Sequence, residues 1–336
     1  MKLSDFDYEL PKDLIAQYPL KERHKAKLLV LNCAKGSIEH YLFEDVLKFI
    51  NKDDLLVLNN TKVLTCRLMG RKATGGKVEV LLTRRKTGTI FEALIQPSRT
   101  KIGEKIFFND GGISGILSGR GEISFRPQDA NTIYQFGQVP LPPYIKREPE
   151  ELDKVYYQTV YADKEGAIAA PTAGLHFTDE ILNEIKSQGI DTAYLTLHVG
   201  LGTFKPVKSD DIAEHTMEPE YFNVPKSVQE KVESARLNKK RIIAVGTTSL
   251  RALESYANGV KEGNTDLFIY PGYKFKIVNS LLTNFHLPKT TLFMLVCAFS
   301  AAKRSEGGVE LMKKAYQEAL DNKYRFYSYG DAMLII

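Results

Sequence analysis

The chain has 336 residues, 43% of them hydrophobic and 26% charged, a composition that excludes disordered and fibrous proteins and is long enough for about two domains. The net charge is small, at +5. The longest apolar run, Leu292 to Ala302, is too short to span a bilayer, and the N-terminus has no apolar signal core. We therefore expect a cytoplasmic protein without a membrane partner.

The cysteines are Cys33, Cys66 and Cys297. An odd number without a C-x-x-C pair argues against a disulfide framework and against a cysteine zinc site. We expect reduced and mostly buried thiols.

The first segment, up to residue 61, contains one strong buried strand, Leu55–Leu58. From residue 63 to 126, short alternating apolar runs are separated by glycine turns, which predicts an antiparallel barrel or sandwich. Closure into a barrel would remove the exposed edges of such a sheet. The expected strands are Val63–Met69, Lys77–Leu82, Ile90–Ile95, Lys105–Phe108 and Gly121–Phe125.

After a proline-rich bend at 139–144, helical and strand patterns alternate, which is typical of an α/β domain. The expected helices are Asp179–Ser187, Ser227–Lys239, Leu250–Tyr256, Thr291–Arg304 and Val309–Asn322, and the expected strands are Thr192–His198 and Arg241–Val245. The predicted organisation is an α/β main domain in two segments, 1–61 and 151–336, with a β domain inserted at 62–150.

The charge is distributed unevenly along the chain. From Lys62 to Lys105 there are eleven Lys or Arg and three Glu, a net charge of +8, so the remainder sums to −3. A module that binds a polyanion shows this pattern, although a solvated basic surface shows it too. The candidate RNA contacts are Arg67, Arg71, Lys72, Lys77, Arg84 and Arg85.

Two segments come close to known phosphate-binding sequence motifs but do not match them. The segment from Gly70 resembles a P-loop, but Val78 stands where Ser or Thr must hold magnesium. The segment from Gly200 to Phe204 follows a strand, yet it lacks the third glycine of the dinucleotide fingerprint. Nucleotide hydrolysis and a Rossmann cofactor site are therefore disfavoured.

A better polar-ligand site follows the expected strand Arg241–Val245. A small-residue turn leads into a helix, where free amides, three hydroxyls and an arginine would bind a carboxylate or a hydroxyl-rich ligand. Simple helix capping is the alternative, and it accounts for one hydroxyl. The predicted ligand-binding residues are Gly246, Thr247, Thr248, Ser249 and Arg251.

Four histidines stand beside Thr, Gly or Asn in loops, a common form for sites carried on a rigid scaffold. No H-E-x-x-H or H-x-H spacing occurs, so we predict no metal. Any one of these histidines can be structural, but all four being structural is a much weaker hypothesis. The candidates for catalysis are His176, His198, His215 and His286, with Glu218 close to the third.

Together these motifs resemble one family, the S-adenosylmethionine:tRNA ribosyltransferase-isomerases of queuosine biosynthesis. The resemblance runs in order over essentially the whole chain. It rests on the blocks Asn59–Val63, Gly75–Leu81, Pro142–Ile145, Tyr157–Tyr161, Gly246–Arg251, Tyr270–Tyr273, Leu282–Pro288 and Tyr329–Leu334, and on those around His176, His198 and His215. Asn60 departs from the pattern, because the family commonly has Asp there.

The resemblance implies an α/β domain with an inserted antiparallel β-barrel of about six strands. It also implies that the ribosyl group of S-adenosylmethionine is transferred and isomerised onto the aminomethyl group of a 7-deazaguanine at the tRNA wobble position. The product would be epoxyqueuosine, with release of adenine and methionine. S-adenosylmethionine would act as a co-substrate, with no permanently bound cofactor and no metal, and we expect a monomer.

Such a reaction needs proton transfers, since the sulfonium makes the adjacent C5′ proton acidic and a base of near-neutral pKa can remove it. We favour His198 or His286, because each ends an apolar run at a loop, a position that places a side chain at the rim of a sheet.

Two other classes of function remain open. An RNA-binding module without chemistry would need only the basic segment, not four loops that carry histidines. A methyltransferase would use the same co-substrate but would deliver its methyl group to RNA.

Overall fold

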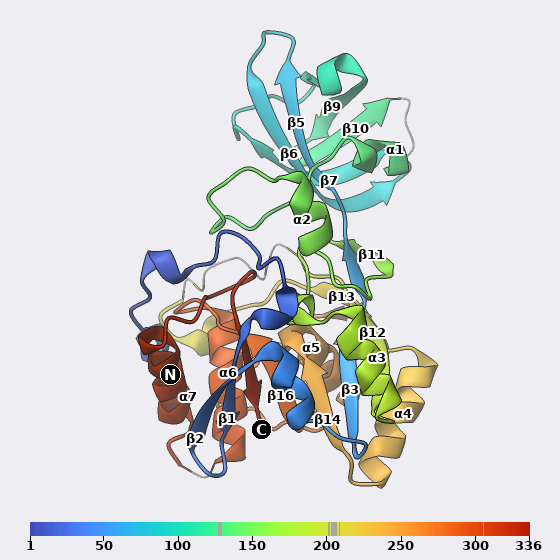
Figure 1. Ribbon diagram of the computed structural model, residues 1–336. Helices are drawn as coiled ribbons and strands as arrows, with labels where there is room; N and C mark the ends of the chain where they lie inside the picture. The colour runs from blue at the N-terminus through green and yellow to red at the C-terminus, as the bar shows by residue number, and fades with distance from the viewer. Residues whose placement is uncertain (127–129, 201, 203–206, 208, 305) are drawn as a thin grey trace. The chain divides into compact units, whose positions relative to one another are not determined.

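In the computed structural model the chain divides into two compact units (Figure 1). One contains Met1–Lys62, Pro143–Arg147 and Tyr156–Ile336, and the other contains Val63–Pro142 and Glu148–Val155. The structure describes residues 1–126, 130–200, 202, 207, 209–304 and 306–336. In this part of the chain, no helix is long and apolar enough to cross a membrane.

The first unit is built on a mixed sheet. Its strands are β1 (Lys27–Asn32), β2 (Ser37–Leu42), β3 (Asp54–Asn59), β12 (Asp191–Leu197), β13 (Glu220–Asn223), β14 (Arg241–Val245), β15 (Glu262–Thr265), β16 (Ser280–Asn284) and β17 (Ala332–Ile335). Within the described residues the order is β15-β13-β12-β3-β14-β16-β17-β1-β2. The neighbours β12, β3, β14 and β16 run parallel, so their carboxyl ends share one edge.

Helices cover both faces of this sheet, because its central strands are apolar on both faces. Every position of β3 is buried; Leu55 and Val57 enter one core, whereas Leu56 and Leu58 enter the other. The first core includes residues of α4 (Lys226–Leu237), α5 (Gly246–Ala257), α6 (Thr291–Lys303) and α7 (Gly308–Asp321). The second includes residues of α3 (Asp179–Ser187) (Figure 1).

The second unit contains a closed barrel, in which six strands of the described residues pair in the order β10-β7-β6-β5-β8-β9, all antiparallel. Val78, Val80 and Leu82 are buried at alternate positions of one strand, as expected when one face fills a barrel. The predicted α/β fold with an antiparallel barrel is confirmed. The barrel strands are β5 (Arg67–Lys72), β6 (Lys77–Thr87), β7 (Ile90–Gln96), β8 (Lys105–Phe108), β9 (Ile113–Gly119) and β10 (Glu122–Arg126).

The remaining elements are two short helices and a two-stranded sheet. They are α1 (Ala130–Gln135), α2 (Glu151–Tyr156) and the pair β4 (Thr61–Val63) with β11 (Lys164–Ala167). The three cysteines are free and buried, as the sequence predicts.

The observed elements differ from the predicted ones in several places, of which three bear on the barrel and the site. The expected strand Val63–Met69 is two strands, because β4 pairs with β11 whereas β5 pairs inside the barrel. The strand β9 was not predicted, because Gly115 interrupts its apolar alternation; a Cβ there would lie 2.7 Å from the Ile123 side chain. The helix expected from Leu250 begins at Gly246, which turns the chain with φ +86°.

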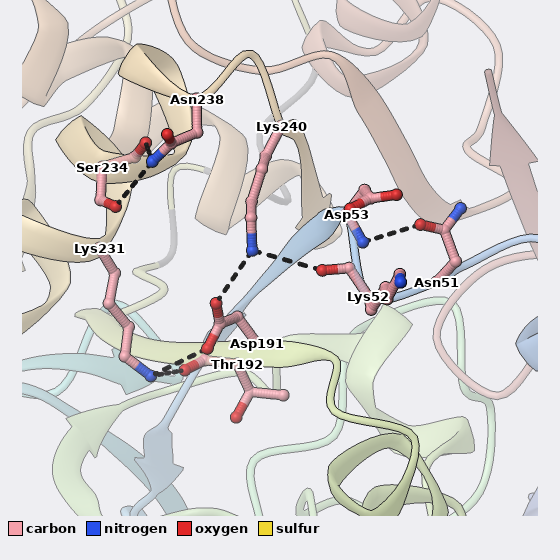
Figure 2. A network of polar contacts seen from close by, with 9 residues as sticks. All are labelled: Asn51, Lys52, Asp53, Asp191, Thr192, Lys231, Ser234, Asn238 and Lys240. Carbon is pink, nitrogen blue, oxygen red and sulfur yellow. Dashed lines mark hydrogen bonds and ion pairs between the residues drawn. The ribbon is translucent and has the colours of Figure 1, made fainter.

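An exposed polar network links the amino ends of two strands to α4 (Figure 2). Asp191, which begins β12, lies 3.5 Å from Lys240 Nζ and 4.0 Å from Lys231 Nζ. These ammonium groups also donate to the carbonyls of Lys52 and Thr192, at 3.3 and 2.8 Å. The Asp191 side chain is 54% exposed, so solvent screens these charges and the network contributes little to stability.

A different ion pair joins the starts of β3 and β14. Asp54 is 2% exposed and accepts hydrogen bonds from Arg241 Nε at 2.8 Å and Nη2 at 2.7 Å. It also accepts from the Asn51 amide at 2.8 Å. Removal of this carboxylate would leave the half-buried guanidinium without its bidentate partner.

We expect Asp54→Ala to lower the free energy of unfolding by about 3 kcal/mol, as is usual when one partner of a buried pair is removed. The matched control Asp191→Ala should cost less than about 1 kcal/mol, because that carboxylate is exposed. Urea unfolding of both variants measures the difference, and equal losses would contradict this ranking.

Candidate functional site

A pocket lies at the shared edge where the central parallel strands end, the usual position of ligands in open α/β sheets. It is lined by three segments that follow or flank these strands, 169–173, 246–248 and 283–286. The lining also includes Tyr144, Val199, Leu292, Tyr327 and Ser328. Among the described residues of this lining there is no Asp, Glu, Lys or Arg, so the pocket is polar through hydroxyls and amides rather than through fixed charge.

The first turn of α5 forms one wall of the pocket. The side chain of Val245, the residue before the helix, does not cap the helix. The amides of the first turn are therefore left to a ligand or to solvent. Gly246, Thr247 and Thr248, three of the predicted ligand-binding residues, line the pocket here.

The buried side chain of Asn59 holds this wall against two strands. Its Oδ1 accepts from the amides of Leu197 at 3.0 Å and Thr61 at 3.1 Å. Its Nδ2 donates to the Leu197 carbonyl at 2.9 Å and to Thr248 Oγ1 at 3.2 Å. The amide therefore uses both its acceptor and its donor capacity to join β3, β12 and α5. Asn59 is not among the candidate residues predicted from the sequence. The Asn-Asn-Thr block that it begins is the sequence feature that points to it.

The adjacent Asn60 also makes a side-chain contact. Its Oδ1 accepts from the Thr196 hydroxyl at 2.7 Å. An aspartate at this position would offer the same acceptor and would add a negative charge.

The imidazole of His198 directly follows β12 and is held on three sides. Its Nδ1 shares a 2.7 Å hydrogen bond with Thr61 Oγ1, and its ring stacks on Tyr221 with centroids 5.6 Å apart. Gly166, with φ +152°, lies against the third side, where a Cβ would be 2.7 Å from the imidazole Cε1. Burial lowers the pKa of His198, so the ring is mainly neutral at pH 7.

His286 lines the pocket itself and is 6% exposed. Its Nε2 lies 3.0 Å from Thr283 Oγ1, and its amide donates to the Tyr316 hydroxyl at 3.0 Å. Tyr8 donates its hydroxyl to the carbonyl of His286. Burial lowers the pKa of this imidazole to about 3, which keeps it neutral throughout the physiological range.

His176 does not line this pocket but lies behind it. Its Nε2 lies 3.2 Å from the Nδ2 of Asn284, a lining residue, and its ring packs on Phe43 with centroids 5.0 Å apart. Burial, followed by the positive charge of Arg325, lowers the pKa of His176 to about 3.

Three further predicted catalytic residues, His198, His215 and Glu218, are also absent from the described pocket lining. The His215 ring makes an edge contact with Phe268, at a centroid distance of 5.2 Å, and burial lowers its pKa. Glu218 is exposed beside Gly202, where a Cβ would lie 2.8 Å from the Glu218 Cβ. In the predicted Gly200–Phe204 motif, residues 201, 203 and 204 lie outside the described part of the chain.

Arg251 and Ser249 also lie outside the pocket lining. Arg251 is 3% exposed and donates through Nη1 to the carboxylate of Glu220, and through Nε to the Leu267 carbonyl at 3.0 Å. Glu220 in turn accepts from the Gly200 amide at 2.9 Å. Arg251 is therefore held in a buried ion pair, while its Nη2 is buried without a hydrogen-bond partner among the described residues. Ser249 is fully buried as well.

The six predicted RNA contacts in the barrel fall into two groups of three. One group is neutralised by carboxylates: Arg67 by Glu79 at 3.0 Å and Glu148 at 2.9 Å, Lys72 by Glu104 at 2.8 Å, and Arg84 by Glu92. Cross-strand pairing of this kind is not visible in a count of charges along the sequence.

The other group keeps exposed positive charge. Arg71 and Arg85 donate to the carbonyls of Gly75 and Gly88, at 3.3 and 2.8 Å. Lys77 makes no ion pair with any described residue. These three cations are available to a polyanion.

Comparison with known proteins identifies the family. The model of the queuosine biosynthesis protein family matches residues 3–335. The chain belongs to this family. The assignment made from the sequence is thereby confirmed.

Relatives and a solved structure agree with the assignment. The chain is 52% identical to the S-adenosylmethionine:tRNA ribosyltransferase-isomerase of a Sulfurihydrogenibium species and 47% identical to that of Aquifex aeolicus, over 100% of each chain. It is 36% identical to the crystal structure of the S-adenosylmethionine tRNA ribosyltransferase from Thermotoga maritima, with a TM-score of 0.57 over 99% of this chain and 100% of that one.

The buried histidines of this queuosine-family protein predict a pH effect on folding. His176 and His286 have folded pKa values of about 3, whereas an unfolded histidine titrates near ~6.5. Between these values only the unfolded state binds the protons, so stability should fall as the pH decreases below ~6.5. His286→Gln should reduce the slope of unfolding free energy against pH by up to about 1.4 kcal/mol per pH unit. Urea unfolding at several pH values between 6 and 5 measures this slope, and an unchanged slope would contradict the assignment.

Proposed function

We propose that this protein transfers and isomerises the ribosyl group of S-adenosylmethionine onto the 7-aminomethyl-7-deazaguanine wobble base of tRNA. The products are epoxyqueuosine-tRNA, adenine and methionine. Family membership supports the reaction class. The observation that carries the proposal is the uncharged pocket at the carboxyl ends of β3, β12, β14 and β16, beside the first turn of α5.

An uncharged lining suits the first chemical step. Loss of the C5′ proton converts the sulfonium cation into a neutral ylide. An environment of low dielectric disfavours the charged form, so it favours loss of this proton. A carboxylate in the lining would stabilise the cation and oppose the step. The described lining contains none.

We assign the proton abstraction to His198. A base with a pKa of about 3, such as His286, is a poor proton acceptor at neutral pH, whereas the pKa of the half-buried His198 is lowered less. The hydrogen bond from Nδ1 to Thr61 fixes the ring, and the next residue, Val199, lines the pocket. His198 gains one proton in this step, and adenine needs one proton when it departs. The two steps are therefore balanced in protons.

The other histidines then have positioning roles or none. His286 shapes the lining as a neutral hydrogen-bonding group, and His176 orients the Asn284 amide from behind the pocket. We assign no step to His215 or Glu218.

The tRNA is recognised in part through exposed cations of the barrel. We assign phosphate contacts to Arg71, Lys77 and Arg85, because these side chains are not neutralised by carboxylates of the described residues. Arg67, Lys72 and Arg84 have structural ion pairs instead.

The overall reaction is tested with S-adenosylmethionine labelled separately in the ribose and in the methyl group. The proposal expects the ribose label in tRNA and the methyl label in released methionine. Methyl label in the RNA would show a methyltransferase instead, and label in neither place would leave only an RNA-binding protein.

His198→Ala should lower both turnover and the exchange of C5′ hydrogen with deuterated solvent by ~10² to 10⁴, the usual loss of a positioned base. Binding of S-adenosylmethionine should change little. Because the pKa of His198 is lowered, exchange by the wild type should be constant above pH ~6.5 and fall in more acidic solution, where the base becomes protonated. Undiminished exchange in His198→Ala, or an equal loss in the control His215→Ala, would refute the assignment.

Replacement of Arg71, Lys77 and Arg85 together by Ala should weaken tRNA binding. The slope of log affinity against log salt should become shallower by ~0.7 to 0.9 for each phosphate interaction that is removed. The matched triple variant of Arg67, Lys72 and Arg84 removes the same formal charge, but its slope should stay near that of the wild type, because each cation already has a carboxylate partner. Identical slopes for both variants would place the RNA elsewhere.

A further inference from the structure

A second cavity adjoins the pocket. Its polar lining consists of Arg23, Tyr156, His176, Arg325, Ser328 and Tyr329. Ser328 lines both cavities, and the 3.2 Å contact between Asn284 and His176 joins a lining residue of one to a lining residue of the other. The two cavities therefore share a wall.

The second cavity is lined by two guanidinium groups, unlike the first, and one of them, that of Arg325, is ion-paired with Asp331 at 3.2 Å. Arg23 donates through Nη1 to the Gln158 carbonyl at 3.1 Å and lies over the Tyr156 ring at 5.3 Å; burial lowers its pKa. The charges of both Arg23 and Arg325 also lower the pKa of His176, so both guanidinium groups are close to this neutral ring. No Asp or Glu belongs to the described lining of this cavity.

The loop 325–331 fixes the position of one of these cations. The Arg325 amide donates to Asp331 Oδ2 at 2.7 Å, and its Nη2 donates to Oδ1 at 3.2 Å. The loop is tight, because a Cβ on Gly330 would lie 2.5 Å from the Arg325 carbonyl oxygen, and Tyr327 has φ +73°. Arg325 is therefore held in place before any ligand arrives, which lowers the entropy cost of binding.

We propose that this cavity is an oxyanion subsite, in which Arg23 and Arg325 bind one carboxylate or phosphate group of a ligand whose remainder lies in the adjoining pocket. Guanidinium groups suit such planar or tetrahedral oxyanions because they donate two hydrogen bonds in a fixed geometry. The inference rests on the proposed function, which supplies two ligands with such a group: S-adenosylmethionine with its carboxylate, and tRNA with its phosphates.

The test compares the wild type with Arg23→Gln, which removes the cation that does not hold the loop. Affinities for S-adenosylmethionine, for its decarboxylated analogue and for tRNA are measured for both proteins. The subsite predicts a loss of roughly ten- to hundred-fold for one natural ligand, as expected for one charge-assisted contact. Arg23→Lys should recover part of it. The control Arg236→Gln removes an exposed cation of α4, which pairs with Glu233, and should bind both ligands like the wild type.

The source of the oxyanion follows from which affinity falls. If the carboxylate binds here, Arg23→Gln should weaken S-adenosylmethionine binding and leave the decarboxylated analogue unaffected. If a tRNA phosphate binds here, only the tRNA affinity should fall, with a salt slope shallower by ~0.7 to 0.9.

Inorganic phosphate gives a readout that needs neither ligand, since it should raise the Tm of the wild type more than that of Arg23→Gln. The subsite is refuted if neither ligand affinity nor the phosphate effect differs between these two proteins. Failure of the wild type to bind S-adenosylmethionine or tRNA would instead refute the proposed function, and the phosphate comparison would still decide the subsite.

Discussion

The site depends on one buried amide. Asn59 ends β3, and its side chain joins backbone and hydroxyl groups that lie 138 and 189 residues away in the sequence, at Leu197 and Thr248. A carboxylate in its place accepts hydrogen bonds but donates none, so the Leu197 carbonyl and the Thr248 hydroxyl would lose their donor. Because the edge of β12 and the start of α5 are both fixed by this side chain, the pocket between them exists only when three distant segments have come together.

The chemistry of the site follows from how it is desolvated. The same burial that shapes the pocket keeps His176, His198 and His286 neutral, so these histidines add no positive charge to the site. The molecule places its fixed charge elsewhere: Arg23 and Arg325 lie in the neighbouring cavity, and the Arg251–Glu220 pair is buried beyond the lining. Under the proposed function, the division between an uncharged cavity and one lined by two arginines suits a ligand that is cationic at one point and anionic at another.

Much of the fold could be predicted because its signals are local. The strand Arg241–Val245 and the helix Asp179–Ser187 have the expected bounds, and the helix begins after Thr178, whose hydroxyl caps it. Local signals fail where a small residue replaces an apolar one, as Gly115 does in β9. Of the candidate site residues, Gly246, Thr247, Thr248 and His286 line the pocket. The direction of Arg251 and the cross-strand partner of Arg67 depend on strand pairing and packing, which the sequence does not display.

The loop 325–331 has a thermodynamic consequence. Its Tyr327 and Ser328 line one cavity, and its Arg325, Ser328 and Tyr329 line the other. A ligand group that enters one cavity and displaces this shared segment changes the free energy of binding in the other cavity. Linkage then requires the coupling free energy to be the same whichever cavity fills first. A single tight loop can therefore make two ligands, or two ends of one ligand, bind cooperatively without any movement of the sheet.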